Sequence, residues 1–189
     1  MKARNPTPEE MEKRTVRFSP ELVDFHKLHE DKSGIPGAVF DKFAPNHVFP
    51  LMVPDTYMGR SEGAGFKGIP GLVVDLTVCP PHIGPVLHRH HETTENFFCL
   101  SGQFEISWGD QGEHALVLNK YDMCSVPPGI FRTFKNLTDE PAWLLVMIQI
   151  PTAEQRDDVD LGQALAKEIS SEYGAQMVEK LKAVGFEFS

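Results

Sequence analysis

The amino-acid sequence predicts an all-β fold, a sandwich or barrel formed by the middle of the chain. From residue 72 onward, short runs rich in β-branched and aromatic residues alternate with turn residues at close spacing, which is typical of such folds. The expected strands are residues 72–79, 86–91, 95–101, 103–108, 114–118, 123–126, 132–136 and 143–150. Prolines and glycines punctuate them, for example at residues 80–81, 109–112 and 127–129.

Residues 1–69 are expected to form an N-terminal arm. Residues 8–14 suit a short helix that has Thr7 as its cap and Pro8 in its first turn. Residues 36–70 are rich in proline and glycine, so regular structure cannot continue there for long, yet they carry aromatic side chains that need cover. We therefore expect the arm to pack on the barrel or on a partner subunit, and a disordered linker is the alternative.

The pattern changes again after the last expected strand. Leu161, Leu165 and Ile169 recur every four residues, and a further apolar series continues toward residue 185. This period predicts two short helices whose apolar stripes pack on the outer wall of the barrel. The barrel is then expected at residues 70–151 and the helical extension at residues 152–189.

Composition excludes several classes of protein. The 189 residues suit one domain with appendages, and a formal net charge of −9 disfavours binding to nucleic-acid phosphates. The apolar runs are too short to cross a membrane, and the N-terminus lacks the apolar core of an export signal. Three cysteines without a CxxC pair predict no disulfide framework. A cytoplasmic protein with a small-molecule partner is expected.

A histidine cluster carries the strongest chemical signal. His88 and His90 are two residues apart in an expected strand, so both side chains point to one face. Glu95 follows after a short turn, and a hairpin returning alongside would bring it opposite the two histidines. Two imidazoles and one carboxylate form a facial triad that suits one divalent ion, Fe(II), Mn(II), Ni(II) or Zn(II), and leaves coordination positions open. A pair of surface histidines is the alternative, because spacing motifs produce false positives.

This segment and a second one resemble the two motifs of the cupin superfamily. The matching residues are His88-x-His90-x4-Glu95-x6-Gly102 and Pro127-x-Gly129-x2-Arg132-x3-Asn136. His82 and Tyr121 stand where the motifs have glycine. The resemblance covers roughly residues 70–150 and implies a double-stranded β-helix, that is, a jelly-roll barrel. It also implies a homodimer, since cupin barrels often exchange N-terminal strands, and an oxidoreductase, isomerase or lyase activity.

Arg132 is the main departure, because the resemblance places the third metal-binding histidine of the family there. An arginine stays protonated, offers no lone pair and repels a nearby cation. Three arrangements remain open. The triad holds the metal while Arg132 swings away to bind a substrate carboxylate; His82 or His114 substitutes as a ligand; or the site is metal-free and Glu95 pairs with Arg132. The first is favoured, because a facial triad needs no fourth ligand and a guanidinium grips a carboxylate at two points.

Side-chain alternation along the strands predicts the remaining walls of the pocket. The expected lining residues are Phe97, Cys99, Phe134, Met147 and Gln149. A mostly apolar pocket with a few polar anchors suits a small aromatic or aliphatic acid, whereas ordinary barrel core is the alternative for each phenylalanine.

The sequence thus predicts a metal-dependent enzyme acting on a small, carboxylate-bearing substrate, with Arg132 as a catalytic residue. Fe(II) is the first-choice metal, and dioxygenase-like oxidoreduction is the first-choice chemistry, ahead of isomerase or lyase chemistry. A non-catalytic barrel that binds a small ligand without metal is the competing class. The chain has no nucleophile elbow, phosphate loop or dinucleotide fingerprint.

Overall fold

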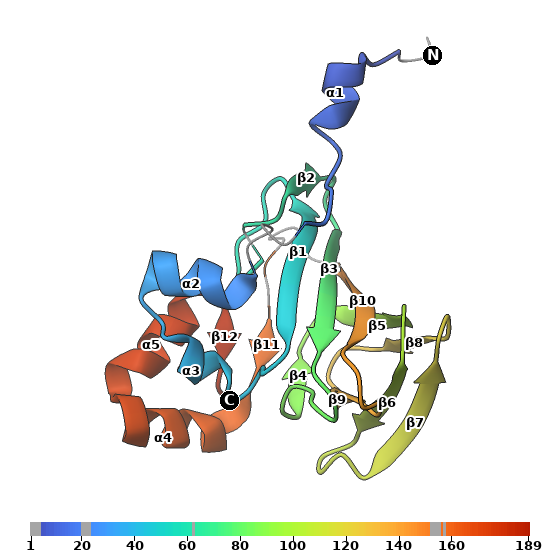
Figure 1. The fold of residues 1–189 in the computed structure, drawn as a ribbon. Helices are drawn as coiled ribbons and strands as arrows, with labels where there is room; N and C mark the ends of the chain where they lie inside the picture. The colour runs from blue at the N-terminus through green and yellow to red at the C-terminus, as the bar shows by residue number, and fades with distance from the viewer. Residues whose placement is uncertain (1–4, 20–23, 62, 152–155, 157) are drawn as a thin grey trace.

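Two six-stranded sheets form the body of the molecule, and all the described helices except the N-terminal one gather at one side of it (Figure 1). The computed structural model describes residues 5–19, 24–61, 63–151, 156 and 158–189. The first sheet has the order β2 (Phe66–Gly68), β1 (His47–Pro54), β3 (Leu72–Cys79), β10 (Ala142–Gln149), β5 (Thr94–Cys99) and β8 (Met123–Val126). The second sheet has the order β12 (Phe186–Glu187), β11 (Val159–Asp160), β4 (His88–His90), β9 (Phe131–Asn136), β6 (Gln103–Trp108) and β7 (His114–Asn119).

The eight expected strands are all present, and β3, β6 and β8 have the expected bounds. The chain passes from one sheet to the other between β3, β4, β5 and β6, and again between β7, β8, β9 and β10. This confirms the jelly-roll barrel. The inward side chains form one apolar core, in which Phe97, Phe104 and Phe134 lie close together.

β1 is a strand that the sequence pattern does not predict, because Pro50 and Pro54 lie within it. It pairs antiparallel with β3 and parallel with β2, with an irregularity between Pro50 and Met52. The first sheet therefore begins well before residue 70, inside the expected arm. Long-range pairing with β3 outweighs the local preference of proline against strand interiors.

The structure describes the helices α1 (Pro8–Glu12), α2 (Phe25–Ser33), α3 (Gly37–Phe40), α4 (Gly162–Tyr173) and α5 (Ala175–Ala183). Thr7 caps α1 in a capping box with Glu10, as expected, and α1 extends away from the body (Figure 1). The two expected C-terminal helices correspond to α4 and α5. No helix of the described residues is long and apolar enough to cross a membrane.

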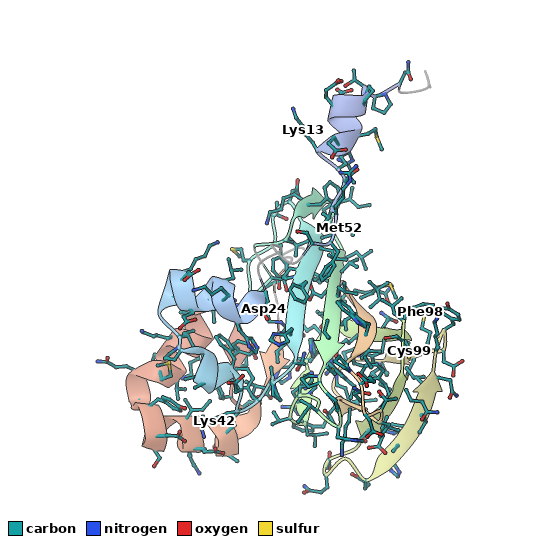
Figure 2. The ribbon with its side chains drawn as sticks, in the orientation of Figure 1. Lys13, Asp24, Lys42, Met52, Phe98 and Cys99 are labelled. Atoms are coloured by element: carbon teal, nitrogen blue, oxygen red, sulfur yellow. The ribbon has the colours of Figure 1, made fainter. Side chains whose placement is uncertain are left out.

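A second apolar cluster joins α3, α4 and α5 to β11 and β12. Phe43 and Phe186 meet edge to face there, with ring centroids 5.1 Å apart. Lys42, which follows α3, adds ion pairs to Glu168 and Glu172 of α4 (Figure 2). Since β11 pairs with β4, this helical side of the molecule supports the strand that carries the histidine cluster.

Candidate metal centre

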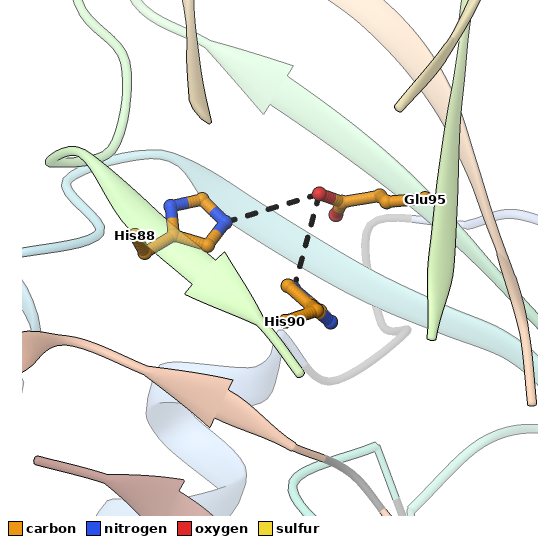
Figure 3. A group of neighbouring side chains, drawn as sticks. All are labelled: His88, His90 and Glu95. Atoms are coloured by element: carbon orange, nitrogen blue, oxygen red, sulfur yellow. Dashed lines mark ion pairs between the residues drawn. The ribbon is translucent and has the colours of Figure 1, made fainter. Parts of the chain in front are cut away.

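His88 and His90 point into the barrel from β4, and Glu95 faces them from β5 (Figure 3). The Nε2 atoms of His88 and His90 lie 3.8 and 3.9 Å from Oε2 of Glu95, and all three side chains are buried. The expectation of a paired hairpin is wrong, because β4 pairs with β9 and β11 while β5 pairs with β10 and β8. The turn after His90 instead carries the chain from one sheet to the other, so the three residues meet across the barrel interior.

Hydrogen bonds on the far side of each ring fix the tautomers of the two histidines. Nδ1 of His88 is 2.9 Å from the carbonyl oxygen of Val86, which can only accept, so Nδ1 carries the proton. Nδ1 of His90 is 2.8 Å from Oγ1 of Thr93 and 3.1 Å from Oδ1 of Asp158, and since the Thr93 hydroxyl itself donates to Asp158, Nδ1 of His90 is the donor to both oxygens. In the neutral form of each ring, the lone pair is therefore on Nε2, on the side of Glu95. Burial, aided by the nearby Arg132 cation, lowers the pKa of His90 to about 4, so His90 is neutral at pH 7.

This arrangement fits a divalent metal ion. Separations of 3.8 and 3.9 Å are too long for hydrogen bonds between the imidazoles and the carboxylate. Nε2 of His90 is buried and has no hydrogen-bond partner within the described residues. A buried lone pair without a donor costs free energy unless something else meets it. Two neutral imidazoles and a carboxylate are a donor set that first-row metals accept.

Arg132 does not turn away from the cluster, so that part of the sequence prediction is wrong. Arg132 is paired in register with His88, is fully buried, and its Nε donates to Oε2 of Glu95 at 3.0 Å. The reason is electrostatic, because a buried guanidinium needs a counter-charge within reach. Burial alone would raise the pKa of Glu95, but Arg132 holds that pKa well below its usual range. Nη2 of Arg132 has no hydrogen-bond partner in the described part of the chain.

Neither alternative histidine joins the cluster. His82 is exposed and its Nε2 lies 2.8 Å from Oδ1 of Asp139. His114 is exposed on β7, beside Trp108 and Glu113. The geometry therefore leaves two arrangements open. Either the three residues hold a metal while Arg132 hydrogen-bonds to Glu95, or the site is metal-free and contains only the Glu95–Arg132 ion pair.

His88 and Glu95 line a cavity of about 70 Å³. The space suffices for about five water molecules, if each needs roughly 10–15 Å³. Most of the wall is apolar, and Phe134 belongs to it as expected. Phe97 and Cys99 share the inward face with Glu95 and are buried in the barrel core, outside the cavity wall.

The prediction for Met147 and Gln149 is wrong. Burial alternates along β10 so that Leu144, Val146 and Ile148 face inward, and Gln149 is exposed. Val146 is the residue of β10 that lines the cavity. Period-two alternation shows which residues share a face, but both faces of β10 are apolar, so the pattern did not show which face is inside.

Sequence reasoning missed four polar residues of the cavity wall. They are Asn46, Arg60, Asp75 and Thr77. Asn46 and Arg60 lie in the expected arm, where no motif marks them. A signal existed for the other two, because Asp75 and Thr77 share one face of an otherwise apolar strand.

Asp158 was also missed, and it supports the cluster through His90. Its Oδ1 accepts from Nδ1 of His90 and from the hydroxyl of Thr93, and its Oδ2 accepts from the backbone N–H groups of Glu92 and Thr93. One carboxylate thus orients the ring of His90 and holds the turn between β4 and β5. Such outer partners keep a metal-binding histidine in the correct tautomer and orientation.

Changing Asp158 to Asn is expected to weaken metal binding by about 10–100-fold, the usual effect of losing an outer carboxylate partner. The affinity for Mn(II) can be measured by isothermal titration calorimetry. Asp139→Asn is the matched control, because Asp139 contacts only the exposed His82 among the histidines described above. Equal affinities of the two variants would contradict the role of Asp158.

A comparison with protein families identifies the barrel. Residues 76–148 match the family model described as the cupin domain. The chain contains a cupin domain. In this cupin domain the matched segment includes His88, His90, Glu95 and Arg132, whereas Asp158 and the polar residues Asn46, Arg60 and Asp75 lie outside it.

Solved structures similar to this chain include three from different sources. The Cnp3 cupin domain of Schizosaccharomyces pombe is 17% identical, with 58% of this chain and 67% of that chain covered and a TM-score of 0.46. KdgF from Halomonas sp. is 10% identical, with coverages of 58% and 82% and a TM-score of 0.43. A sugar phosphate isomerase of the cupin superfamily from Silicibacter pomeroyi is 27% identical, with a TM-score of 0.43. The match to the isomerase covers 60% of this chain and 62% of that chain. The search of curated proteins found no match to this chain.

Proposed function

We propose that this protein is a metal-dependent cupin enzyme acting on a small, carboxylate-bearing substrate, with dioxygenase-like oxidoreduction as its reaction class. One observation carries the proposal. Two imidazoles direct their Nε2 atoms toward a buried carboxylate without hydrogen-bonding to it, at the wall of a cavity. A two-histidine, one-carboxylate set is the donor set of non-haem Fe(II) oxygenases.

His88, His90 and Glu95 would hold the metal, with Fe(II) as first choice and Mn(II), Ni(II) or Zn(II) as alternatives. A bound ion of this kind supplies Lewis-acid or redox chemistry, and with only three protein ligands it has open positions for substrate.

The neighbouring residues of the chain would prepare this site. Arg132 keeps Glu95 ionised and fixes one of its oxygens by hydrogen bonding. The apolar part of the wall limits the water that reaches the cluster and strengthens charge interactions inside. Arg60, rather than Arg132, is the arginine that lines the cavity among the described residues. We therefore propose Arg60 as the cation that meets the substrate carboxylate, since a guanidinium can bind a carboxylate at two points.

A specific observation favours a second candidate, a cupin that binds a small ligand without metal. The Glu95–Arg132 pair already neutralises the buried carboxylate, and a fixed cation 3.0 Å from a ligand oxygen opposes a second cation there. In that case the cavity would serve for ligand binding alone.

Metal analysis separates the two candidates. Untagged protein is loaded anaerobically with Fe(II) or Mn(II), desalted and analysed by elemental mass spectrometry, and the enzyme proposal expects about one ion per chain at this three-ligand site. His90→Ala should lose the ion, whereas His82→Ala, which alters an exposed histidine outside the cluster, should retain it. A content near zero in the unaltered protein would overturn the enzyme proposal and support the metal-free candidate.

A further inference from the structure

The inner face of β3 is polar where an ordinary barrel strand is apolar. Burial alternates along β3 so that Val73, Asp75, Thr77 and Cys79 face inward. The outward positions hold Leu72, Val74, Leu76 and Val78, all only half-buried. A strand that followed packing alone would turn its four large aliphatic residues toward the core. In the structure, β3 pairs with β1 and β10 in the opposite orientation. The buried side chains of Asp75 and Thr77 therefore line the cavity.

Asn46, immediately before β1, extends this polar surface. Its side chain is 2% exposed and lines the cavity, and its Oδ1 has no hydrogen-bond partner among the described residues. Buried amide oxygens are almost always paired with a donor. An oxygen that is buried, unpartnered and next to a cavity therefore indicates that a ligand supplies the donor.

The polar wall of Asn46, Asp75 and Thr77 is separate from the metal cluster. Asp75 is paired with Val146 of β10, and Glu95 lies beyond β10 on β5. Two strand spacings of about 4.8 Å put β3 and β5 roughly 10 Å apart. The hydroxyl of Ser61, also buried, donates to Oδ2 of Asp75 at 3.3 Å. The cavity thus has a metal-ligand end and a hydrogen-bonding end.

We propose that Asn46, Asp75 and Thr77 bind a hydroxyl group of the ligand, which makes the substrate class a small hydroxy acid. The proposal rests on the proposed function, because it names the substrate of that same cavity. Asn46 Oδ1 accepts the single proton of a ligand hydroxyl, the Thr77 hydroxyl donates to its oxygen, and the Asp75 carboxylate is the alternative acceptor in the same wall. An ammonium group offers donors only and would leave the Thr77 hydroxyl without an acceptor on the ligand, so 3-aminopropanoate serves as the competing probe.

The test is a titration of the full chain with a matched series of acids. Propanoate and butanoate are compared with their 2-, 3- and 4-hydroxy derivatives and with 3-aminopropanoate, by calorimetry, on metal-free and on Mn(II)-loaded protein. At least one hydroxy acid is expected to bind about tenfold more tightly than its unsubstituted parent, the scale of one additional hydrogen bond. Asn46→Leu and Thr77→Val keep the side-chain shape, and each should reduce that advantage to less than about threefold while parent-acid binding stays unchanged.

Gln149→Leu, on the outer face of β10, is the control, and this variant should still bind the hydroxy acid about tenfold more tightly than the parent acid. Both test variants should fold, because each replaces a buried polar group while keeping the number and branching of the side-chain heavy atoms, and thermal unfolding checks this. Equal binding of hydroxy and parent acids, tighter binding of the amino acid, or no binding of any acid would overturn the proposal. The titration of the metal-free protein separates this proposal from the proposed function. The preference for a hydroxy acid over its parent acid at Asn46 does not depend on a bound metal, whereas the proposed function does.

Discussion

Glu95→Ala is expected to abolish metal binding and to lower the free energy of unfolding by about 3–5 kcal/mol, the cost of breaking a buried ion pair from one side. The variant removes one metal ligand and also leaves the fully buried guanidinium of Arg132 without the carboxylate it contacts at 3.0 Å. Elemental analysis measures the first effect, and urea denaturation of the metal-free protein measures the second.

The double variant Glu95→Leu/Arg132→Met separates the two effects. Replacing both members of a buried ion pair by apolar residues is often neutral or stabilising, so this protein should regain stability while still binding no metal. If Glu95→Ala unfolds at the same urea concentration as the unaltered protein, another group compensates the charge of Arg132, and the account of the pair given above is wrong.

Arg132→His is expected to raise metal affinity by at least about tenfold. Two unit charges 4 Å apart at an effective dielectric constant of 20 interact by about 4 kcal/mol, so removing a cation next to the ligands relieves a large repulsion. The new imidazole would also stand opposite His88, its partner in register, and could add a third nitrogen ligand. Calorimetric titration with Mn(II) or Zn(II) measures the change.

Arg132→Met is the matched control, because it removes the charge without adding a ligand. The histidine variant should bind more tightly than the methionine variant, and the difference measures the contribution of the third imidazole. If the two variants bind equally, position 132 does not face the metal, and the resemblance of this position to a ligand position is misleading.

The grouping of His88, His90 and Glu95 could be predicted because its signals are local. His88 and His90 share a face by the period of a strand, and the four residues before Glu95 are too few to carry the chain far from them. The outcome for Arg132 could not be read in the same way. Whether a guanidinium turns toward a carboxylate or away from it depends on burial and on the counter-charges available, which are set by strands distant in sequence.

The same distinction applies to the fold. The eight barrel strands, the helix capped by Thr7 and the two C-terminal helices could be predicted from residue patterns, because period, turn residues and caps act within a few residues. Three features follow from long-range contacts alone: β1 joins the sheet despite its prolines, one particular face of β10 is inside, and Asp158 supports His90. Each of these depends on pairing or burial between distant segments, where a contact that forms only in the folded state outweighs the local preference.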